Sequence, residues 1–371
     1  MKRFWILFST EFKVWRHDPT TAMSGLIPPL LLLTAFGLLF GGRLSFDIAV
    51  INRDTGEASK LLYEAFQETI SPLDNNPYYN ILSLSETEAW EAYATYQIES
   101  VWIIPEDFSN RLEAGLNPEL EMYFNNYNDD RAKNHRIYSA EVIWRFYEKI
   151  KMPPSPLTLA ETYPLPEMVD WVSIIAVGAA LLSAMVGGMM NIFMLTHKEK
   201  IAHISLEFAL CPRSLLSVLL SKTTLALIMS LATFSVFLLI LEVWMGLWPG
   251  KYLFASWLLA GLMALFWIAI ALLTGLNNHN FLAGTIATIL TGITIFFISG
   301  GINIVRGQEH KVIFISWLTP YIHAVDPLRD LILFHTIPDG WSIILLKLFG
   351  FAAVSTAVCW YFTARQLRRS H

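Results

Sequence analysis

Six long apolar runs constrain this chain more than any other feature of its sequence. Charged residues are absent from them, except that Lys347 interrupts the last run. The runs are Pro19–Gly42, Trp171–Thr196, Thr223–Leu241, Tyr252–Asn278, Phe281–Val305 and Trp341–Ala364. A helix needs about 20 apolar residues to cross the roughly 30 Å hydrocarbon layer of a bilayer. The sequence therefore predicts a polytopic α-helical membrane protein with six transmembrane helices.

Residues 43–170, between the first two runs, have a different composition. They hold 22 of the 31 acidic residues but only 10 of the 26 basic ones, which leaves the remainder of the chain basic. Both cysteines, Cys211 and Cys359, lie outside this stretch, so no disulfide can stabilise it. About 125 residues can bury a core of their own. We therefore expect a separate, water-exposed domain inserted after the first span.

This insert has the pattern of an α+β domain. Apolar strand-like segments alternate with segments of helical spacing, and Ser85 and Glu88 form a capping box that opens one helix. The expected elements are strands Phe46–Ile51, Ser100–Ile104 and Glu119–Phe124, and helices Glu57–Ile70, Ser85–Gln97, Glu106–Ala114 and Asp129–Lys151.

The flanking charges predict the orientation of the spans. With the N-terminus inside, the inner flanks carry eleven Lys and Arg residues and the short outer loops carry four. Positive residues favour the cytosolic side, so both termini are expected in the cytosol and residues 43–170 outside. Residues 1–18 form a basic amphipathic helix, because Trp5, Phe8, Phe12 and Trp15 share one face; such a helix lies in the membrane interface.

No enzyme motif is present. The segment Ser221-Lys222-Thr223-Thr224 lacks the glycines of a phosphate-binding P-loop, and no His-Glu-x-x-His zinc motif occurs. His197 and His203 flank a charged loop and are expected to be solvated. The sequence therefore predicts no catalytic residue, cofactor site or metal site in this chain, and no nucleic-acid binding.

Two features of the spans leave alternatives open. Lys347 is a charge inside a span, which indicates either a role in a translocation path or a lysine that reaches back to the interface. Small residues recur in two rows, which fit packing within the chain and dimerisation equally well. The rows are Ala180, Ala184 and Gly188, and Gly284, Gly292 and Gly300.

The order of these parts, with several local motifs, resembles that of a known family. The motifs are Glu11–Pro19 before the first span, Ala49–Asp54 and Val101–Phe108 in the insert, and Ser299–Gly301, Pro320-Tyr321 and Asp326–Arg329 near the last span. The chain resembles the ABC transporter type-2 permeases, in the subgroup with a large extracytoplasmic domain after the first span. The resemblance implies an outer re-entrant segment at residues 302–340.

Residues 197–214 resemble the cytosolic coupling loop of that family, with Lys222 matching its later lysine and Ala202-His203 standing where Gly-Thr is usual. Ile201, Ile204 and Phe208 also have helical spacing among charges, which is typical of a partner site. Packing on the protein's own inner loops or on lipid headgroups is the alternative. The expected ATPase contacts are Glu199, Ile201, His203, Ile204, Glu207, Phe208 and Pro212.

The resemblance implies a permease subunit of an ATP-driven exporter in the inner cell membrane. A separate cytosolic ABC ATPase would bind ATP and Mg, and the permease would form a homodimer or heterodimer with a similar permease. Membrane lipid and a periplasmic adaptor are further partners to consider. The apolar spans favour a hydrophobic or amphiphilic cargo, such as a drug, an antibiotic or a lipid, over an ion. An ion-exporter permease, a membrane receptor and an intramembrane enzyme are the alternatives.

Overall fold

The structure is a computed structural model of the 371-residue chain. It describes residues 2–17, 24–40, 45–71, 75–95, 97–124, 129–150, 171–201, 215–277, 280–302 and 317–369. The chain divides into two compact units. The membrane unit comprises residues 1–41 and 166–371, and the αβ unit comprises residues 42–165.

The αβ unit is built on one mixed four-stranded sheet. Its strands are β1 (Phe46–Asn52), β2 (Tyr79–Ile81), β3 (Ser100–Ile104) and β4 (Glu121–Phe124). The order is β2-β1-β3-β4, with β1 parallel to both of its neighbours and β4 antiparallel to β3. The helices are α4 (Glu57–Glu68), α5 (Glu86–Ala94), α6 (Phe108–Glu113) and α7 (Asp129–Lys149).

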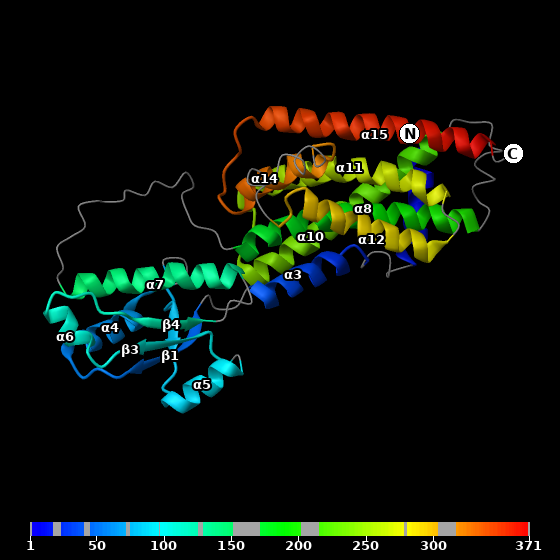
Figure 1. The fold of residues 1–371 in the computed structure, drawn as a ribbon. Coiled ribbons are helices and arrows are strands. Elements are labelled where there is room, and N and C mark those ends of the chain that lie inside the picture. The colour runs from blue at the N-terminus through cyan, green and yellow to red at the C-terminus, as the bar shows by residue number, and fades with distance from the viewer. Residues whose placement is uncertain are drawn as a thin grey trace. The chain divides into compact units, whose positions relative to one another are not determined.

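Both faces of this sheet are buried. Ile48 and Trp102 face a core that α4 and α7 complete, whereas Ala49 and Val101, one residue away on the same strands, face a core completed by α5. Figure 1 shows α7 and α5 on opposite sides of the sheet. Every residue of β3 is buried, which is why its sequence is a continuous apolar run and not an alternating one.

The elements expected in the αβ unit are present, with one addition. The capping box of α5 forms, because the Ser85 and Glu88 side chains each accept a hydrogen bond from the other residue's backbone N–H. Strand β2 was not predicted from the sequence. It spans three residues, which is too short for an alternating pattern to be recognised.

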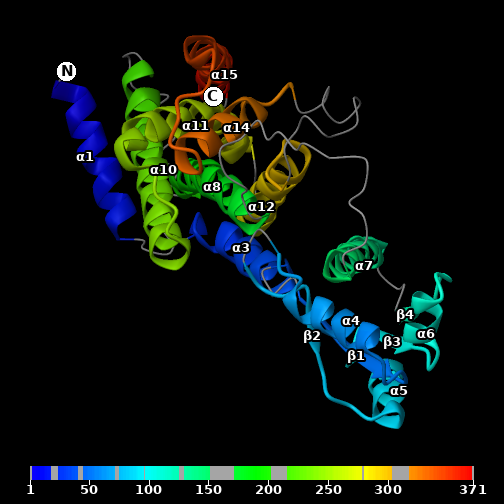
Figure 2. The ribbon, with the colours of Figure 1, turned by 90° about the vertical axis from the view of Figure 1, so that its left-hand side faces the viewer.

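The membrane unit consists of helices packed around one central helix. Its helices are α1 (Lys2–Arg16), α3 (Ile27–Phe40), α8 (Trp171–Ile201), α10 (Leu216–Met245), the short 3-10 helix η1 (Gly250–Tyr252), α11 (Leu253–Asn277), α12 (Phe281–Ile298), α14 (Pro320–Ile332) and α15 (Trp341–Arg369). Helix α8 contacts α3, α10, α11, α12 and α14, and Figure 2 shows it among them. Its side chains are buried without interruption from Ile175 to Phe193.

Small residues allow α8 to occupy this central position. A Cβ atom on Gly188 would lie 2.8 Å from Ile268 of α11, and one on Gly25 would lie 2.4 Å from the Cα atom of Gly187. Likewise, a Cβ atom on Gly292 of α12 would lie 2.6 Å from Val186. Of the small residues that recur in rows in the sequence, Gly188 and Gly292 thus allow close helix packing within this chain.

Among the described residues, five helices are long and apolar enough to cross a membrane: α8, α10, α11 with η1, α12 and α15. The first predicted span appears as α3, a 14-residue apolar helix, and its predicted ends lie outside the described residues. Helix α10 extends beyond its predicted range of Thr223–Leu241 at both ends. The prediction stopped at Lys222 because charges are costly in a span, yet Lys222 is buried within the helix.

Candidate functional site: a buried ion cluster at the ends of α8 and α10

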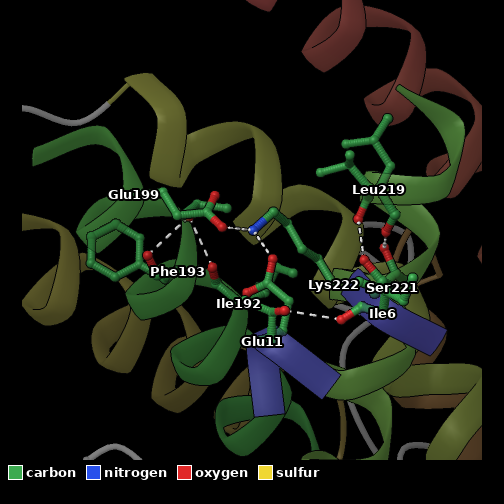
Figure 3. Close-up of polar contacts among 12 residues, drawn as sticks. Ile6, Glu11, Ile192, Phe193, Glu199, Leu219, Ser221 and Lys222 are labelled. Carbon is green, nitrogen blue, oxygen red and sulfur yellow. Dashed lines mark hydrogen bonds and ion pairs between the residues drawn. The ribbon is translucent and has the colours of Figure 1, made fainter. Parts of the chain in front are cut away.

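Lys222 of α10 lies at the centre of a buried cluster of charges. Its Nζ atom forms ion pairs with Glu11 of α1, at 2.5 Å, and with Glu199 of α8. Figure 3 shows the lysine between the two carboxylates. The side chains are 4%, 6% and 15% exposed for Lys222, Glu11 and Glu199, respectively. One ammonium group therefore joins α8 and α10 to α1, which is distant from them in sequence.

Burial determines how much the ion pairs of this cluster matter for stability. Moving a charge out of water costs several kcal/mol, which an ion pair offsets only when its geometry is good. Removing one partner leaves an uncompensated buried charge and typically costs about 3–5 kcal/mol. Because Lys222 is the common partner of both carboxylates, its ion pairs hold α1, α8 and α10 together at this point.

Further contacts of α1 strengthen the same junction. The Trp15 indole N–H donates a 2.7 Å hydrogen bond to the Asn191 side-chain oxygen on α8. Phe8 and Trp15 also pack against a small apolar cluster of Leu195, Leu225 and Met229. Trp5 is 62% exposed. The aromatic residues of α1 are thus divided, since some fix the helix to the membrane unit while others remain on its surface.

This junction lies at the two helix ends that the predicted coupling loop connects. Glu199 is two residues before the end of α8 at Ile201, and α10 begins at Leu216. Ile201 is 66% exposed. The other predicted ATPase contacts, His203, Ile204, Glu207, Phe208 and Pro212, lie outside the described residues. Glu199 is therefore the one predicted contact that the structure places in the cluster.

One expectation for this region is corrected. His197 was expected in a solvated loop, but it lies in the last turns of α8 and is 4% exposed. Its ring stacks 5.8 Å from that of Phe193 and lies 5.2 Å from that of Phe281. The physical reason is that α8 continues to Ile201, past the first charged residues, so His197 remains within the helix packing.

The sequence matched Lys222 only to a lysine that follows the family's coupling loop, and did not predict that Glu11 and Lys222 form part of a charge cluster. The available signal was a lysine flanked by apolar helical sequence, the same signal that singled out Lys347. The two lysines differ in the structure, because Lys222 is buried and paired whereas Lys347 is exposed on α15. Both interpretations of Lys347 remain predictions.

A second buried cation lies where the ends of α8 and α12 meet α14. The Arg329 guanidinium, on α14, donates hydrogen bonds to the carbonyl oxygens of Ile174, Gly300 and Gly301 and pairs with Asp326 at 2.7 Å. Nearby, the Tyr321 hydroxyl donates a 2.7 Å hydrogen bond to a carbonyl of α8. The Ser-Gly-Gly and Asp-Pro-Leu-Arg motifs are thereby brought together. The bonds fix α14 to the backbone of two spans.

The membrane unit also has an open surface pocket of about 300 Å³. Side chains of α3, α8 and α10 line it, including Leu33, Thr34, Val172 and Met245. Its lining is largely apolar, which suits a hydrocarbon group better than an ion. Within the described ranges, no group of three or more His, Cys, Asp or Glu side chains is placed to hold a metal ion.

Comparison with known proteins identifies the family. The model of the ABC-2 family transporter proteins matches residues 21–364, which is nearly the whole chain. No curated protein and no solved structure matches the chain. The family match agrees with the apolar helices and indicates a membrane component of a transporter. On this evidence, the chain belongs to the ABC-2 transporter family.

Proposed function

We propose that this chain is the permease subunit of an ATP-driven exporter, with ATP hydrolysed by a separate cytosolic ABC ATPase. In this proposal the chain has six spans, both termini are cytosolic and residues 43–170 lie outside. It works as a dimer with a second permease. The single observation that carries the proposal, beside the family match, is the buried cluster of Lys222, Glu11 and Glu199.

The cluster supports a coupling role because α8 runs from it through the centre of the membrane unit. A helix of 31 residues is about 46 Å long at 1.5 Å per residue. Any displacement of the loop after Ile201 acts on one end of α8, and α8 contacts five other helices of the membrane unit. Lys222 ties the same end to α1 and α10, so these helices move with it. A closely packed interior transmits such displacement well.

The lining of the membrane unit supports a hydrophobic or amphiphilic substrate. The open surface pocket lined by α3, α8 and α10 is largely apolar. Two cations buried among the described residues of the unit, Lys222 and Arg329, are already engaged by acidic or carbonyl oxygens. Neither is placed to bind a substrate ion along the apolar helix faces. A drug, an antibiotic or a lipid-like molecule fits these surfaces better than a bare ion does.

The orientation can be tested with single cysteines. Ser85→Cys and Ser205→Cys, each in a background without Cys211 and Cys359, are treated in intact cells with a membrane-impermeant thiol reagent. We expect labelling of the first variant and protection of the second, because Ser85 belongs to the αβ unit and Ser205 to the predicted coupling loop. Labelling of Ser205→Cys with protection of Ser85→Cys would reverse the orientation.

The coupling role is tested by Phe208→Ala and Glu207→Lys in the tagged full-length chain. Loss of an aromatic anchor at an interface typically costs about 2 kcal/mol or more, and the lysine adds a charge clash. Both variants should insert normally but recover little ATPase on purification and show no substrate-stimulated ATP hydrolysis. Trp5→Ala, a change at an exposed aromatic residue of α1, is the matched control. Normal ATPase recovery and export in both loop variants would reject coupling through this loop.

A further inference from the structure

One face of α7 in the αβ unit carries an exposed apolar stripe. Ile137, Trp144 and Tyr147 are 56%, 51% and 42% exposed, and Ala140 between them is also exposed. The opposite face of α7 is buried, where residues such as Val142 and Phe146 enter the core against the sheet. The helix therefore has a second apolar face that the core of its own unit does not use.

The spacing of this α7 stripe is specific. Ile137, Ala140, Trp144 and Tyr147 follow one another at intervals of three, four and three residues, which are the a and d positions of a heptad repeat. That spacing produces a narrow seam suited to another helix. An apolar seam rimmed by charged residues marks an interaction site. The exposed charges that flank it are Arg136, Glu141 and Glu148.

These charges indicate which helix fits the α7 stripe. Arg136 occupies the g position and Glu141 the e position of the next heptad, which are the two positions that meet across a parallel helix pair. Two copies of α7 in parallel would therefore place Arg136 of each copy beside Glu141 of the other. An antiparallel pair would bring the acidic e positions, Glu141 and Glu148, together. A membrane-surface helix would carry a mainly basic polar face, whereas this one carries both signs.

We infer that the α7 stripe binds the same stripe of a second copy of this chain, with the two helices parallel, so that the αβ units form part of a homodimer interface. A two-fold interface brings the same residues together from both subunits, which a self-complementary a/d seam allows. The inference rests on the dimer in the proposed function, and it names the partner as a second copy.

The size of the α7 stripe explains why the membrane unit is needed. From Ile137 to Tyr147 the helix rises about 15 Å, and a contact of that length buries less surface than a stable dimer of soluble proteins requires. Membrane anchoring holds the two αβ units at a high effective concentration, which makes a weak contact sufficient. The test therefore uses the full-length chain in membranes.

The first experiment uses disulfide formation. Ala140→Cys, in a full-length background with Cys211→Ser and Cys359→Ser, is oxidised mildly in membranes. A d position faces its own counterpart in a parallel pair, within the reach of a disulfide, so a cross-linked homodimer is expected. Arg145→Cys is the matched control, because it is exposed on the same helix but points away from the seam; it should remain uncross-linked.

The second experiment reverses the flanking charges in the Ala140→Cys background. Arg136→Glu and Glu141→Arg should each lower the cross-linked fraction about tenfold, and the double variant should restore it. Cross-linking to a different protein, equal cross-linking of Arg145→Cys, or an uncross-linked Ala140→Cys chain would overturn the inference. Co-purification of the ATPase with the same variants tests the permease role separately, because the α7 stripe is not part of the coupling site.

Discussion

In the membrane unit the cations Lys222 and Arg329 have side chains that are 4% exposed, whereas each ion pair among the described residues of the αβ unit has at least one exposed partner. Arg53 and Glu86, for example, are 44% and 46% exposed. Among the buried polar residues of the αβ unit, His135 is surrounded by uncharged aromatic rings. The membrane unit thus buries charges in pairs, and the αβ unit buries a neutral base.

This difference follows from the surroundings of each unit. A surface ion pair in water contributes little, because solvent screens it. A pair enclosed by spans is screened much less and fixes the helices that supply it, at a large cost if one partner is lost. The comparison therefore predicts a gradient of mutational effects, from the buried cations to the surface pairs.

The largest effect is expected for Lys222→Met. The variant leaves Glu11 and Glu199 buried without a cation, which typically costs about 3–5 kcal/mol of stability, so thermal unfolding in detergent should occur at a much lower temperature. A triple variant, Lys222→Met with Glu11→Gln and Glu199→Gln, removes the buried charges and should recover most of that loss. Recovery of stability without recovery of substrate-stimulated ATP hydrolysis would separate the cluster's coupling role from its packing role.

Equal stability of the parent and the Lys222→Met chain would contradict the view that this cluster holds the helices together. It would also remove the main support for coupling through α8.

The next effect concerns the shape of the buried cation. Arg329 satisfies three backbone carbonyls and one carboxylate through a planar guanidinium, which a lysine cannot reproduce. Arg329→Lys should therefore cost about 2–3 kcal/mol, since buried carbonyls lose their donors. Lys222→Arg should cost less, because its partners are carboxylate side chains, which can change rotamer, and not fixed backbone carbonyls. The melting temperatures of the two variants in detergent show which one loses more stability. A smaller loss for Arg329→Lys than for Lys222→Arg would contradict our interpretation.

A third effect is the pH dependence of stability that buried, uncharged His135 gives the αβ unit. Burial lowers the pKa of His135 to about 4, below the ordinary value of about 6.5. Between these values the unfolded chain binds a proton that the folded unit excludes, so stability falls as the pH falls. For a fragment of residues 45–154, which we expect to fold alone as a monomer, this loss is about 2 kcal/mol from pH 8 to pH 5.

The control for this pH dependence is His135→Phe. The Tyr79 hydroxyl lies 3.0 Å from the His135 Nδ1 atom and donates its proton to the backbone carbonyl of residue 135, so the tyrosine keeps a partner in the variant. Urea unfolding at each pH should give a flatter profile for the variant above pH 5. The same slope in both proteins would show that carboxylates, and not His135, cause the loss.

Some of this architecture could be predicted from sequence for clear physical reasons. The strand Ser100–Ile104 and the capping box at Ser85 depend on neighbouring residues, so their patterns are local. The cluster was not predictable, because Glu11 and Lys222 are 211 residues apart and no local pattern connects them. The acceptors of Arg329 are backbone carbonyls, which every residue carries and no sequence distinguishes.

The smallest effect is expected at the surface of the αβ unit. Arg53 lies 2.5 Å from Glu86, a geometry as close as that of the Lys222–Glu11 pair, but both side chains are nearly half exposed. Water and salt screen such a pair, and ordering two long side chains has an entropic cost. Arg53→Ala should therefore leave the melting temperature of the 45–154 fragment indistinguishable from that of the parent, both at low salt and at 1 M salt, where the Debye length is about 3 Å. A destabilisation comparable to that of Lys222→Met would mean that distance, and not burial, determines the strength of ion pairs in this protein.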